Sequence, residues 1–283
     1  MTKRIAIFSD VHGNVHAFQA MYQDAIQQGI DESWFVGDLL MPGPGISSIW
    51  QIFKKLQPTV IVRGNWDDLT VRGARGQMDL DRPSHVYFAR LAQYIGERVD
   101  PAVIDEIASW PLHQAKKVGA LTFGISHNLP DLDMGQALFP TNDSSNFDQL
   151  FADDKIDVAI YAHVHHELLR YASDERKVLN PGSVGEPFNG WDRLQKDTRA
   201  YYLIMDVDDL GIAGLNFRHV AYDREAEGRL ADESGVPYLY LYHRTLESGR
   251  VDTHNQPLVD EQNQKFGYAE EYRQYARKLN NKK

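Results

Sequence analysis

Short apolar segments alternate with amphipathic ones along the first sixty residues. Apolar runs at 4–8, 34–36 and 59–62 have the length and composition of strands, whereas 14–28 and 46–56 have the pattern of helices. Continuous apolar strands that alternate with helices are typical of a sheet that is buried on both faces. The first part of the chain is therefore predicted to be α/β.

A helical pattern follows between residues 67 and 111. One side of it carries Val86, Phe88, Leu91 and Ile95. We expect a helical insertion over 66–114 that caps the sheet.

The later apolar runs are closely spaced, as in hairpins and meanders. They lie at 115–118, 121–125, 158–161, 168–171, 177–179, 200–207 and 212–220. Together with the first part, they predict a layered αββα sandwich of two mixed sheets flanked by helices, and not a TIM barrel or a single doubly wound sheet.

The end of the chain carries an amphipathic helical pattern. Its apolar face consists of Tyr268, Tyr272, Tyr275 and Leu279. We expect this face to dock on the main domain, so that 1–220 form that domain and 221–283 a C-terminal helical extension packed on it.

The amino-acid composition excludes or disfavours several classes of site and partner. The chain has no cysteine, which excludes disulfides, thiolate catalysis and iron–sulfur clusters. Forty acidic and thirty basic residues give a formal charge of −10, which disfavours binding to long nucleic acids. No stretch has the ~20 apolar residues of a membrane span, and the apolar run at 5–8 is too short for a signal peptide. We expect a cytoplasmic protein without a membrane partner.

Polar residues cluster where the predicted strands end, which is where open α/β sheets build ligand sites. The cluster comprises Asp10, His12, Asp38, Asn65, His127, His163 and His165. Such a mixed nitrogen and oxygen set suits Mn, Fe or Zn better than Ca or Mg.

Local geometry places two further histidines, His166 and His16, outside this set. If the segment is extended, His163 and His165 point the same way and His166 the opposite way, towards a supporting or surface position. His16 lies inside the first predicted helix, so we expect it at the rim of the site or in solvent.

The order of these motifs resembles the calcineurin-like metallophosphoesterase superfamily, whose signature runs DxH, GD, GN, H and GHxH. Here the motifs read DVHGN, GD, GN, SHN and AHVHH, within residues 4–220. The segment NPGSVG at 180–185 is similar to one in the small bacterial and archaeal phosphodiesterase branch of that family. Gly43-Pro44-Gly45 and the Gly-x-Pro at 235–237 resemble the same branch.

The resemblance implies a two-metal catalytic domain in which a metal-bridging hydroxide attacks phosphorus. Mn is the first candidate for both metals, with Fe or Zn as alternatives. By resemblance, one metal is held by Asp10, His12, Asp38 and His165, and the other by Asp38, Asn65, His127 and His163, so that Asp38 bridges them.

Two residues are candidates for contact with the substrate phosphate. Asn14 is expected to cap the first helix, so that backbone N–H groups of that turn face the phosphate. Arg63 fits either a phosphate clamp or a structural ion pair.

The chain departs from the family at Trp66. Many members carry a histidine after Gly-Asn that protonates the leaving oxygen, and indole cannot act as that acid. We therefore expect cleavage of phosphoanhydrides or activated phosphodiesters, with diadenosine polyphosphates as natural candidates. Trp66, Phe188 and Trp191 could stack on a base, although ordinary packing of loop aromatics is the favoured explanation for each of them.

Three alternatives stay open. One is a serine/threonine protein phosphatase-like phosphomonoesterase, which the missing histidine disfavours. A second is a catalytically silent scaffold, which the complete set of seven positions disfavours. A third is a nuclease, for which short oligonucleotides are compatible with the acidic charge. The partner we expect is a small phosphorylated molecule such as a nucleotide, and a homo-oligomer is compatible with the sequence.

Overall fold

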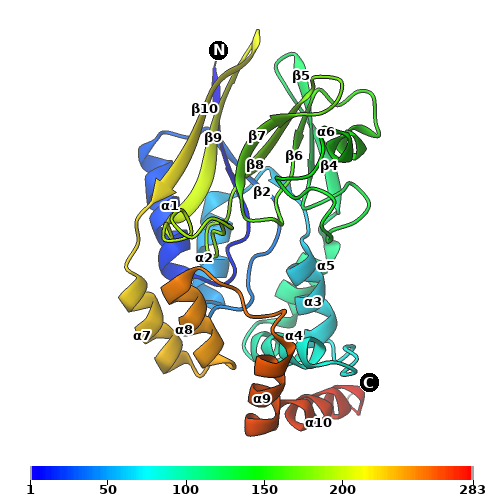
Figure 1. Cartoon of the computed structure of the whole chain (residues 1–283), viewed down its shortest axis with the longest axis vertical. Helices are drawn as coiled ribbons and strands as arrows, with labels where there is room; N and C mark the ends of the chain where they lie inside the picture. The colour runs from blue at the N-terminus through cyan, green and yellow to red at the C-terminus, as the bar shows by residue number, and fades with distance from the viewer. Residues whose placement is uncertain (1, 282–283) are drawn as a thin grey trace.

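Two five-stranded mixed sheets form the centre of the molecule (Figure 1). The computed structural model describes residues 2–281. The first sheet has the order β10-β9-β1-β2-β3. Its strands are β1 (Lys3–Phe8), β2 (Glu32–Phe35), β3 (Val60–Ile61), β9 (Ala200–Asp208) and β10 (Gly211–Val220). The central strands β1, β2 and β3 are parallel, whereas β9 and β10 run antiparallel along one edge.

The second sheet has the order β4-β5-β6-β8-β7. Strands β5, β6 and β8 are parallel, and the hairpin partners β4 and β7 are antiparallel to them. The strands are β4 (His113–Val118), β5 (Leu121–Ser126), β6 (Val158–Ile160), β7 (Glu167–Tyr171) and β8 (Lys177–Pro181). The predicted pair of mixed sheets is thus confirmed.

Alternating side chains of β1 divide the core into two layers. Ile5 and Ile7 face the second sheet, where Trp34 packs edge-on against Phe123 with ring centroids 5.5 Å apart. Ala6 and Phe8 point the other way, into the core under the helices α1 (Val15–Gln27) and α2 (Ser47–Leu56). This period of two is expected for a strand that is buried on both faces.

The outer face of the second sheet has a thinner cover. A short helix α6 (Ser144–Phe147) and a 3₁₀ turn η1 (Asp148–Phe151) lie there. They place Phe147, Leu150 and Phe151 against the sheet.

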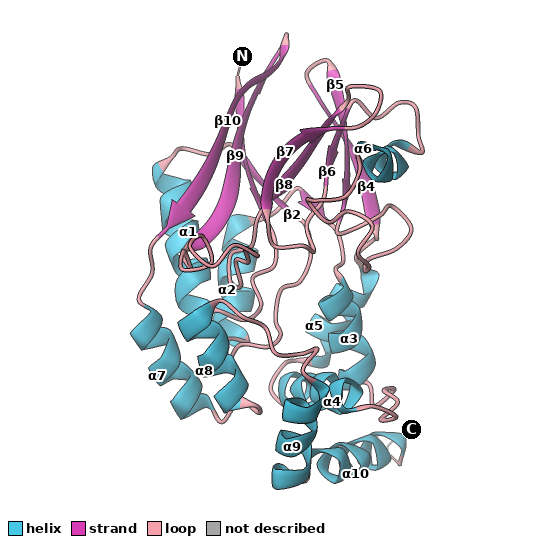
Figure 2. Cartoon of the chain, in the orientation of Figure 1, coloured by secondary structure: helices cyan, strands magenta, loops and turns pink. Residues whose placement is uncertain are grey.

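The predicted helical insertion consists of three helices, α3 (Asn65–Ala74), α4 (Pro83–Gly96) and α5 (Pro101–Ser109). Proline stands at the first position of both α4 and α5, where its fixed φ favours a helix start. The predicted range 66–114 is wrong at its C-terminal end, because β4 already begins at His113. Figure 2 shows these helices beyond the ends of the sheets, on the side where the parallel strands finish.

Four helices complete the chain, namely α7 (Arg224–Ser234), α8 (Leu239–Ser248), α9 (Gln256–Phe266) and α10 (Tyr268–Asn280). The tyrosine face of α10 packs on α3 and α4. The Tyr272 hydroxyl donates to the Gly73 carbonyl at 3.0 Å, and the Tyr275 hydroxyl donates to that of Ala74 at 2.5 Å. In the described part of the chain, every helix is too short or too polar to cross a membrane.

Candidate dinuclear metal centre

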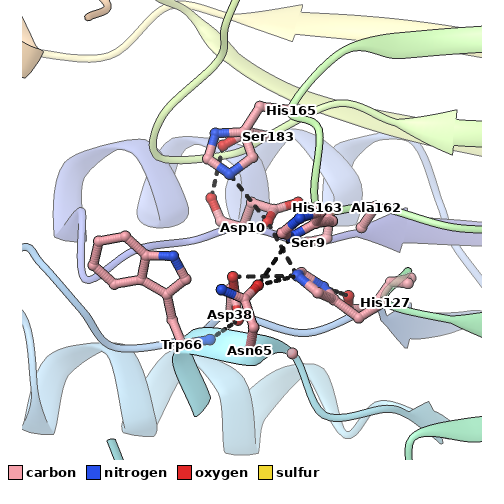
Figure 3. A network of polar contacts seen from close by, with 12 residues as sticks. Ser9, Asp10, Asp38, Asn65, Trp66, His127, Ala162, His163, His165 and Ser183 are labelled. Carbon is pink, nitrogen blue, oxygen red and sulfur yellow. Dashed lines mark hydrogen bonds and ion pairs between the residues drawn. The ribbon is translucent and has the colours of Figure 1, made fainter. Parts of the chain in front are cut away.

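All seven predicted site residues converge where the parallel strands end (Figure 3). Loops after β1, β2, β5 and β6 carry six of the side chains, and the seventh stands at the start of α3. The residues are Asp10, His12, Asp38, Asn65, His127, His163 and His165.

One group of possible ligands is formed by Asp10, His12 and His165. The Oδ1 atom of Asp10 lies 3.2 Å from Nε2 of His165 and 3.8 Å from Nε2 of His12. The two imidazole Nε2 atoms are 3.1 Å apart. This spacing allows all three atoms to bind one ion.

A second group is formed by Asp10, Asp38 and His127. Nε2 of His127 lies 3.2 Å from Oδ2 of Asp38 and 3.9 Å from Oδ1 of Asp10. Oδ2 of Asp38 is also 4.0 Å from Nε2 of His12. Each of the two carboxylates therefore lies near His12 and His127, which belong to different groups, so either carboxylate could bind two ions.

Each of these carboxylates has one oxygen held by the protein and the other facing the centre. Ser9 Oγ donates to Oδ2 of Asp10 at 2.7 Å, and the Trp66 backbone N–H donates to Oδ1 of Asp38 at 2.8 Å. Oδ1 of Asp10 is buried and has no hydrogen-bond partner within residues 2–281. The groups that face it are the imidazoles of His12, His127 and His165, and a metal ion could bind this oxygen together with their Nε2 atoms, so the residues present fit the expected metals.

Backbone carbonyls orient three of the imidazoles. His12, His127 and His165 each donate from Nδ1 to a carbonyl oxygen, which leaves Nε2 directed at the centre. The acceptors are the carbonyls of Met41 (2.6 Å), Val36 (2.7 Å) and Glu186 (2.6 Å), respectively.

His163 is held differently. Its Nδ1 lies 2.9 Å from Oδ1 of Asn65, and its Nε2 accepts the backbone N–H of Gly135 at 3.2 Å. Asn65 Oδ1 is in turn 3.2 Å from Nε2 of His127. Asn65 and His163 thus lie beside the second group, next to His127.

The expected extended segment around these histidines is wrong. Strand β6 ends at Ile160, and His163 and His165 have φ values of 65° and 58°. These left-handed turns, and not a strand period, bring both rings to the centre. His166 is turned away, and its ring packs between Phe139 and Phe188.

Left-handed backbone is concentrated in this site. Asp10, His12 and Asp38 have φ values of 52°, 50° and 65°, so five of the seven residues adopt it. For a non-glycine residue this conformation costs roughly 1–2 kcal/mol. Such strain persists where the surrounding structure imposes it, and it is typical of functional sites.

The electrostatics of the centre favour ionised carboxylates. Burial opposes ionisation of Asp10 and Asp38, but the neighbouring histidines outweigh it and lower the pKa of both carboxyls. Burial likewise opposes protonation of His127 and His165, yet the two aspartates raise the pKa of these imidazoles to about 10 and about 9. Burial and the His127 charge lower the pKa of His163 to about 4.

Asp67 supports the site from behind, a role that the sequence analysis missed. Its carboxylate accepts the N–H groups of Asp38 (2.9 Å), Leu39 (3.0 Å) and Gly64 (3.0 Å). Its position three residues after Gly64, in the first turn of α3, is the sequence signal for such a cap. Gly64 itself must lack a side chain, because a Cβ there would lie 2.1 Å from Oδ1 of Asp38.

The NPGSVG segment also contacts the site. Ser183 Oγ and the Gly185 N–H donate to the Asp10 carbonyl at 2.8 and 2.9 Å. A Cβ at Gly185 would lie 2.0 Å from the Val11 carbonyl oxygen, so the two segments are in close contact. This segment therefore helps to hold Asp10 in its left-handed turn.

The two candidate phosphate contacts are engaged within the protein. Oδ1 of Asn14 accepts the Ala17 N–H at 3.0 Å, which confirms the predicted helix cap, and its Nδ2 donates to the Tyr222 hydroxyl at 3.1 Å. Arg63 pairs with Asp68 at 2.8 Å and donates to the Ala108 carbonyl at 3.0 Å. These contacts favour the structural ion pair for Arg63.

The aromatic residues around the site differ in their surroundings. Trp66 is half-buried, and its ring lies edge-on to His12 and to Phe88 at 5.0 Å in each case. Phe188 packs on His166, and Trp191 is 66% exposed. Trp66 contacts a site residue with its ring, whereas Phe188 does so through its backbone N–H, which donates to the His165 carbonyl at 3.4 Å.

His16 lies at the N-terminal end of α1, outside the metal centre. Its Nδ1 is 2.7 Å from Glu227, with a side-chain exposure of 34%. The partly solvated position predicted for it is confirmed.

Known proteins share the fold of this chain. A 25% identical relative, uncharacterized protein MJ0912 of Methanocaldococcus jannaschii, aligns over 82% of this chain and 95% of its own length. The solved structure of hypothetical protein PH1004 from Pyrococcus horikoshii covers 88% of this chain and 99% of its own, with 16% identity and a TM-score of 0.70. A metallophosphoesterase from Sphaerobacter thermophilus covers 87% and 100%, with 23% identity and a TM-score of 0.64.

Residues 4–210 match the family model of the calcineurin-like phosphoesterase superfamily domain. The match spans most of the chain and includes all seven residues of the centre. The chain belongs to the calcineurin-like phosphoesterase superfamily.

Proposed function

We propose that this chain is a dinuclear-metal-dependent phosphoesterase that hydrolyses phosphoanhydride or activated phosphodiester bonds, with nucleotides such as diadenosine polyphosphates as substrates. The observation that carries the proposal is the buried, unpartnered Oδ1 of Asp10 among the imidazoles of His12, His127 and His165. Two divalent ions, Mn²⁺ in the first instance, would activate water at neutral pH and neutralise charge on the phosphoryl oxygens.

The chain's own residues fix the geometry of this reaction. Asp10 and Asp38 are held by Ser9 and by the Trp66 N–H, so that one oxygen of each faces the centre. This preorganisation places the charged groups before the substrate arrives, which is the main source of electrostatic catalysis.

The side chain of Trp66 supports the choice of bond. Its indole lies beside His12, and it cannot protonate a leaving alkoxide. A nucleotide phosphate or an aryl oxide leaves without such help, whereas the alkoxide of serine needs a proton. Substrates with good leaving groups are therefore favoured.

The test is turnover by the metal-loaded protein on three substrates side by side: diadenosine tetraphosphate, bis-p-nitrophenyl phosphate and a phosphoserine peptide. The proposal predicts cleavage of the first two with Mn²⁺ and almost none of the peptide. The nucleotide products would identify the bond that breaks.

Two other results would contradict the proposal. Peptide turnover equal to that of the other substrates would support a protein phosphatase in which another group replaces the missing acid. Metal binding without turnover of any of the three would support the scaffold alternative.

A further inference from the structure

Glu186 is a buried carboxylate beside the metal centre that the proposed reaction does not use. It follows the NPGSVG segment and is 5% exposed. Neither of its carboxylate oxygens has a hydrogen-bond partner in the part of the chain that the structure describes. A buried carboxylate without donors loses its hydration and gains nothing in return, so it needs a compensating charge nearby.

The backbone fixes this carboxylate on one side of the centre. The Glu186 N–H donates to Ser183 Oγ at 2.8 Å, and the Glu186 carbonyl accepts Nδ1 of His165 at 2.6 Å. The preceding N–H, of Gly185, donates to the Asp10 carbonyl at 2.9 Å. Glu186 is thus tied directly to His165 and, through the preceding residue Gly185, to Asp10.

The charge of Glu186 acts on that same group. Among the charged groups around it are His12, His165 and Asp10. The Tyr242 hydroxyl donates to Glu227 at 2.8 Å, and within residues 2–281 no hydroxyl donates to either carboxylate oxygen of Glu186. No hydrogen bond therefore offsets the burial of this carboxylate.

We infer that Glu186 is a positioning residue whose unpartnered carboxylate stabilises the cation held by Asp10, His12 and His165. The inference rests on the proposed function, because it needs a metal at this position. It assigns to Glu186 no contact with the metal or with the substrate.

A second buried glutamate provides a matched control. Glu227 is 0% exposed, but its carboxylate accepts from His16 Nδ1 (2.7 Å), from the His16 N–H (3.0 Å) and from the Tyr242 hydroxyl (2.8 Å). Removal of the Glu227 charge therefore disrupts existing hydrogen bonds, whereas removal of the Glu186 charge disrupts none.

The experiment compares Glu186→Gln and Glu227→Gln in the full chain at pH 8. Thermal unfolding is measured after metal removal with EDTA, and Mn²⁺ affinity is measured by calorimetry. We expect Glu186→Gln to weaken Mn²⁺ binding about tenfold and to change the Tm of the metal-free protein by less than about 2 °C, because no hydrogen bond is lost. Glu227→Gln should lower the Tm of the metal-free protein.

A second variant tests whether the glutamine amide is itself unfavourable at this buried site. Glu186→Met removes charge and polarity together and should weaken Mn²⁺ binding to a similar extent.

The outcomes separate the two proposals. If both Glu186 variants bind Mn²⁺ as tightly as the wild type does, or lower the Tm of the metal-free protein as much as Glu227→Gln does, the role of Glu186 is wrong and the phosphoesterase proposal stands. If the wild type itself binds no divalent metal, both proposals fail.

Discussion

The carboxylate of Asp67 accepts the backbone N–H of Asp38 at 2.9 Å, so a helix side chain holds one of the two central carboxylates from behind. The same carboxylate accepts the N–H of Gly64 at 3.0 Å. One buried side chain thereby joins the loop after β2 to the start of α3, which carries Asn65.

Substitution of Asp67 tests this support. Asp67→Asn replaces an acceptor with a donor that faces backbone N–H groups, so we expect a loss of about 1–3 kcal/mol in the free energy of unfolding. We also expect reduced Mn²⁺ occupancy, because the loop that carries Asp38 loses its anchor. The measurements are denaturant unfolding and metal content after dialysis.

The neighbouring Asp68 is the control for this substitution. It pairs with Arg63 and is 39% exposed, so Asp68→Asn should cost less than about 1 kcal/mol and leave the metal content unchanged. Equal effects of the two substitutions would show that Asp67 has no special role.

Metal affinity should depend steeply on pH. In the metal-free protein, burial lowers the pKa of His127 and His165, but the negative charges of Asp38 and Asp10 have the larger effect. They raise the pKa of these two imidazoles to about 10 and about 9, respectively. Both imidazoles are then protonated at neutral pH, and a bound metal must displace those protons. Apparent Mn²⁺ affinity should therefore rise between pH 6 and pH 8, by roughly tenfold per pH unit for each proton displaced.

Calorimetry in buffers of different ionisation enthalpy counts the released protons directly. We expect about two per chain at pH 7.5. His163 should contribute none, because burial and the His127 charge lower its pKa to about 4. Mn²⁺ binding without proton release would contradict this assignment of charges.

The same pKa shifts affect the stability of the metal-free protein. A histidine whose pKa is raised by folding stabilises the folded state below its unfolded pKa of about 6.5. The contribution of His127 and His165 should therefore be complete below about pH 6.5 and be lost as the pH rises through about 9 to 10.

Trp66 is the residue that should separate substrate classes. Trp66→His restores an acid beside His12, so turnover of a phosphoserine peptide should rise at least about tenfold. Loss of the indole should at the same time reduce turnover of diadenosine tetraphosphate, if the ring stacks on a base.

Trp66→Phe is the matched substitution, because it removes the indole but supplies no acid. It should leave peptide turnover low. Identical substrate profiles for the two variants would show that the missing histidine does not determine specificity.

The C-terminal helix should contribute to stability through its tyrosine face. The Tyr272 hydroxyl donates to the Gly73 carbonyl at 3.0 Å and accepts the Met78 N–H at 3.2 Å. Tyr272→Phe should therefore lower the free energy of unfolding by about 1–2 kcal/mol. Tyr171→Phe, at a half-exposed tyrosine on β7, should change it by less than about 0.5 kcal/mol. A similar small effect at Tyr272 would contradict the proposed role of this face.

The sequence predicted the sheets and the seven converging residues because both follow from strand order. Polar residues directly after apolar strands, such as Asp10 after β1, must meet at one edge of a parallel sheet. The order and spacing of the motifs indicated the superfamily, which the match over residues 4–210 confirms.

Other features depend on contacts that no local pattern encodes. The left-handed turns at His163 and His165 are imposed by the surrounding structure. The side chains point the same way, as predicted, but because of these turns and not because of the alternation of side chains along a strand. The partner of Arg63 and the absence of any partner for Glu186 become visible only when distant segments pack together.

Hydrolysis of bis-p-nitrophenyl phosphate by metal-stripped protein, measured as Mn²⁺ is added stepwise, is the decisive test of a two-metal phosphoesterase. We expect no turnover before addition, a rise that saturates near two equivalents per chain, and loss of that activity in Asp10→Asn. Turnover that is independent of added metal and unaffected by Asp10→Asn would contradict it.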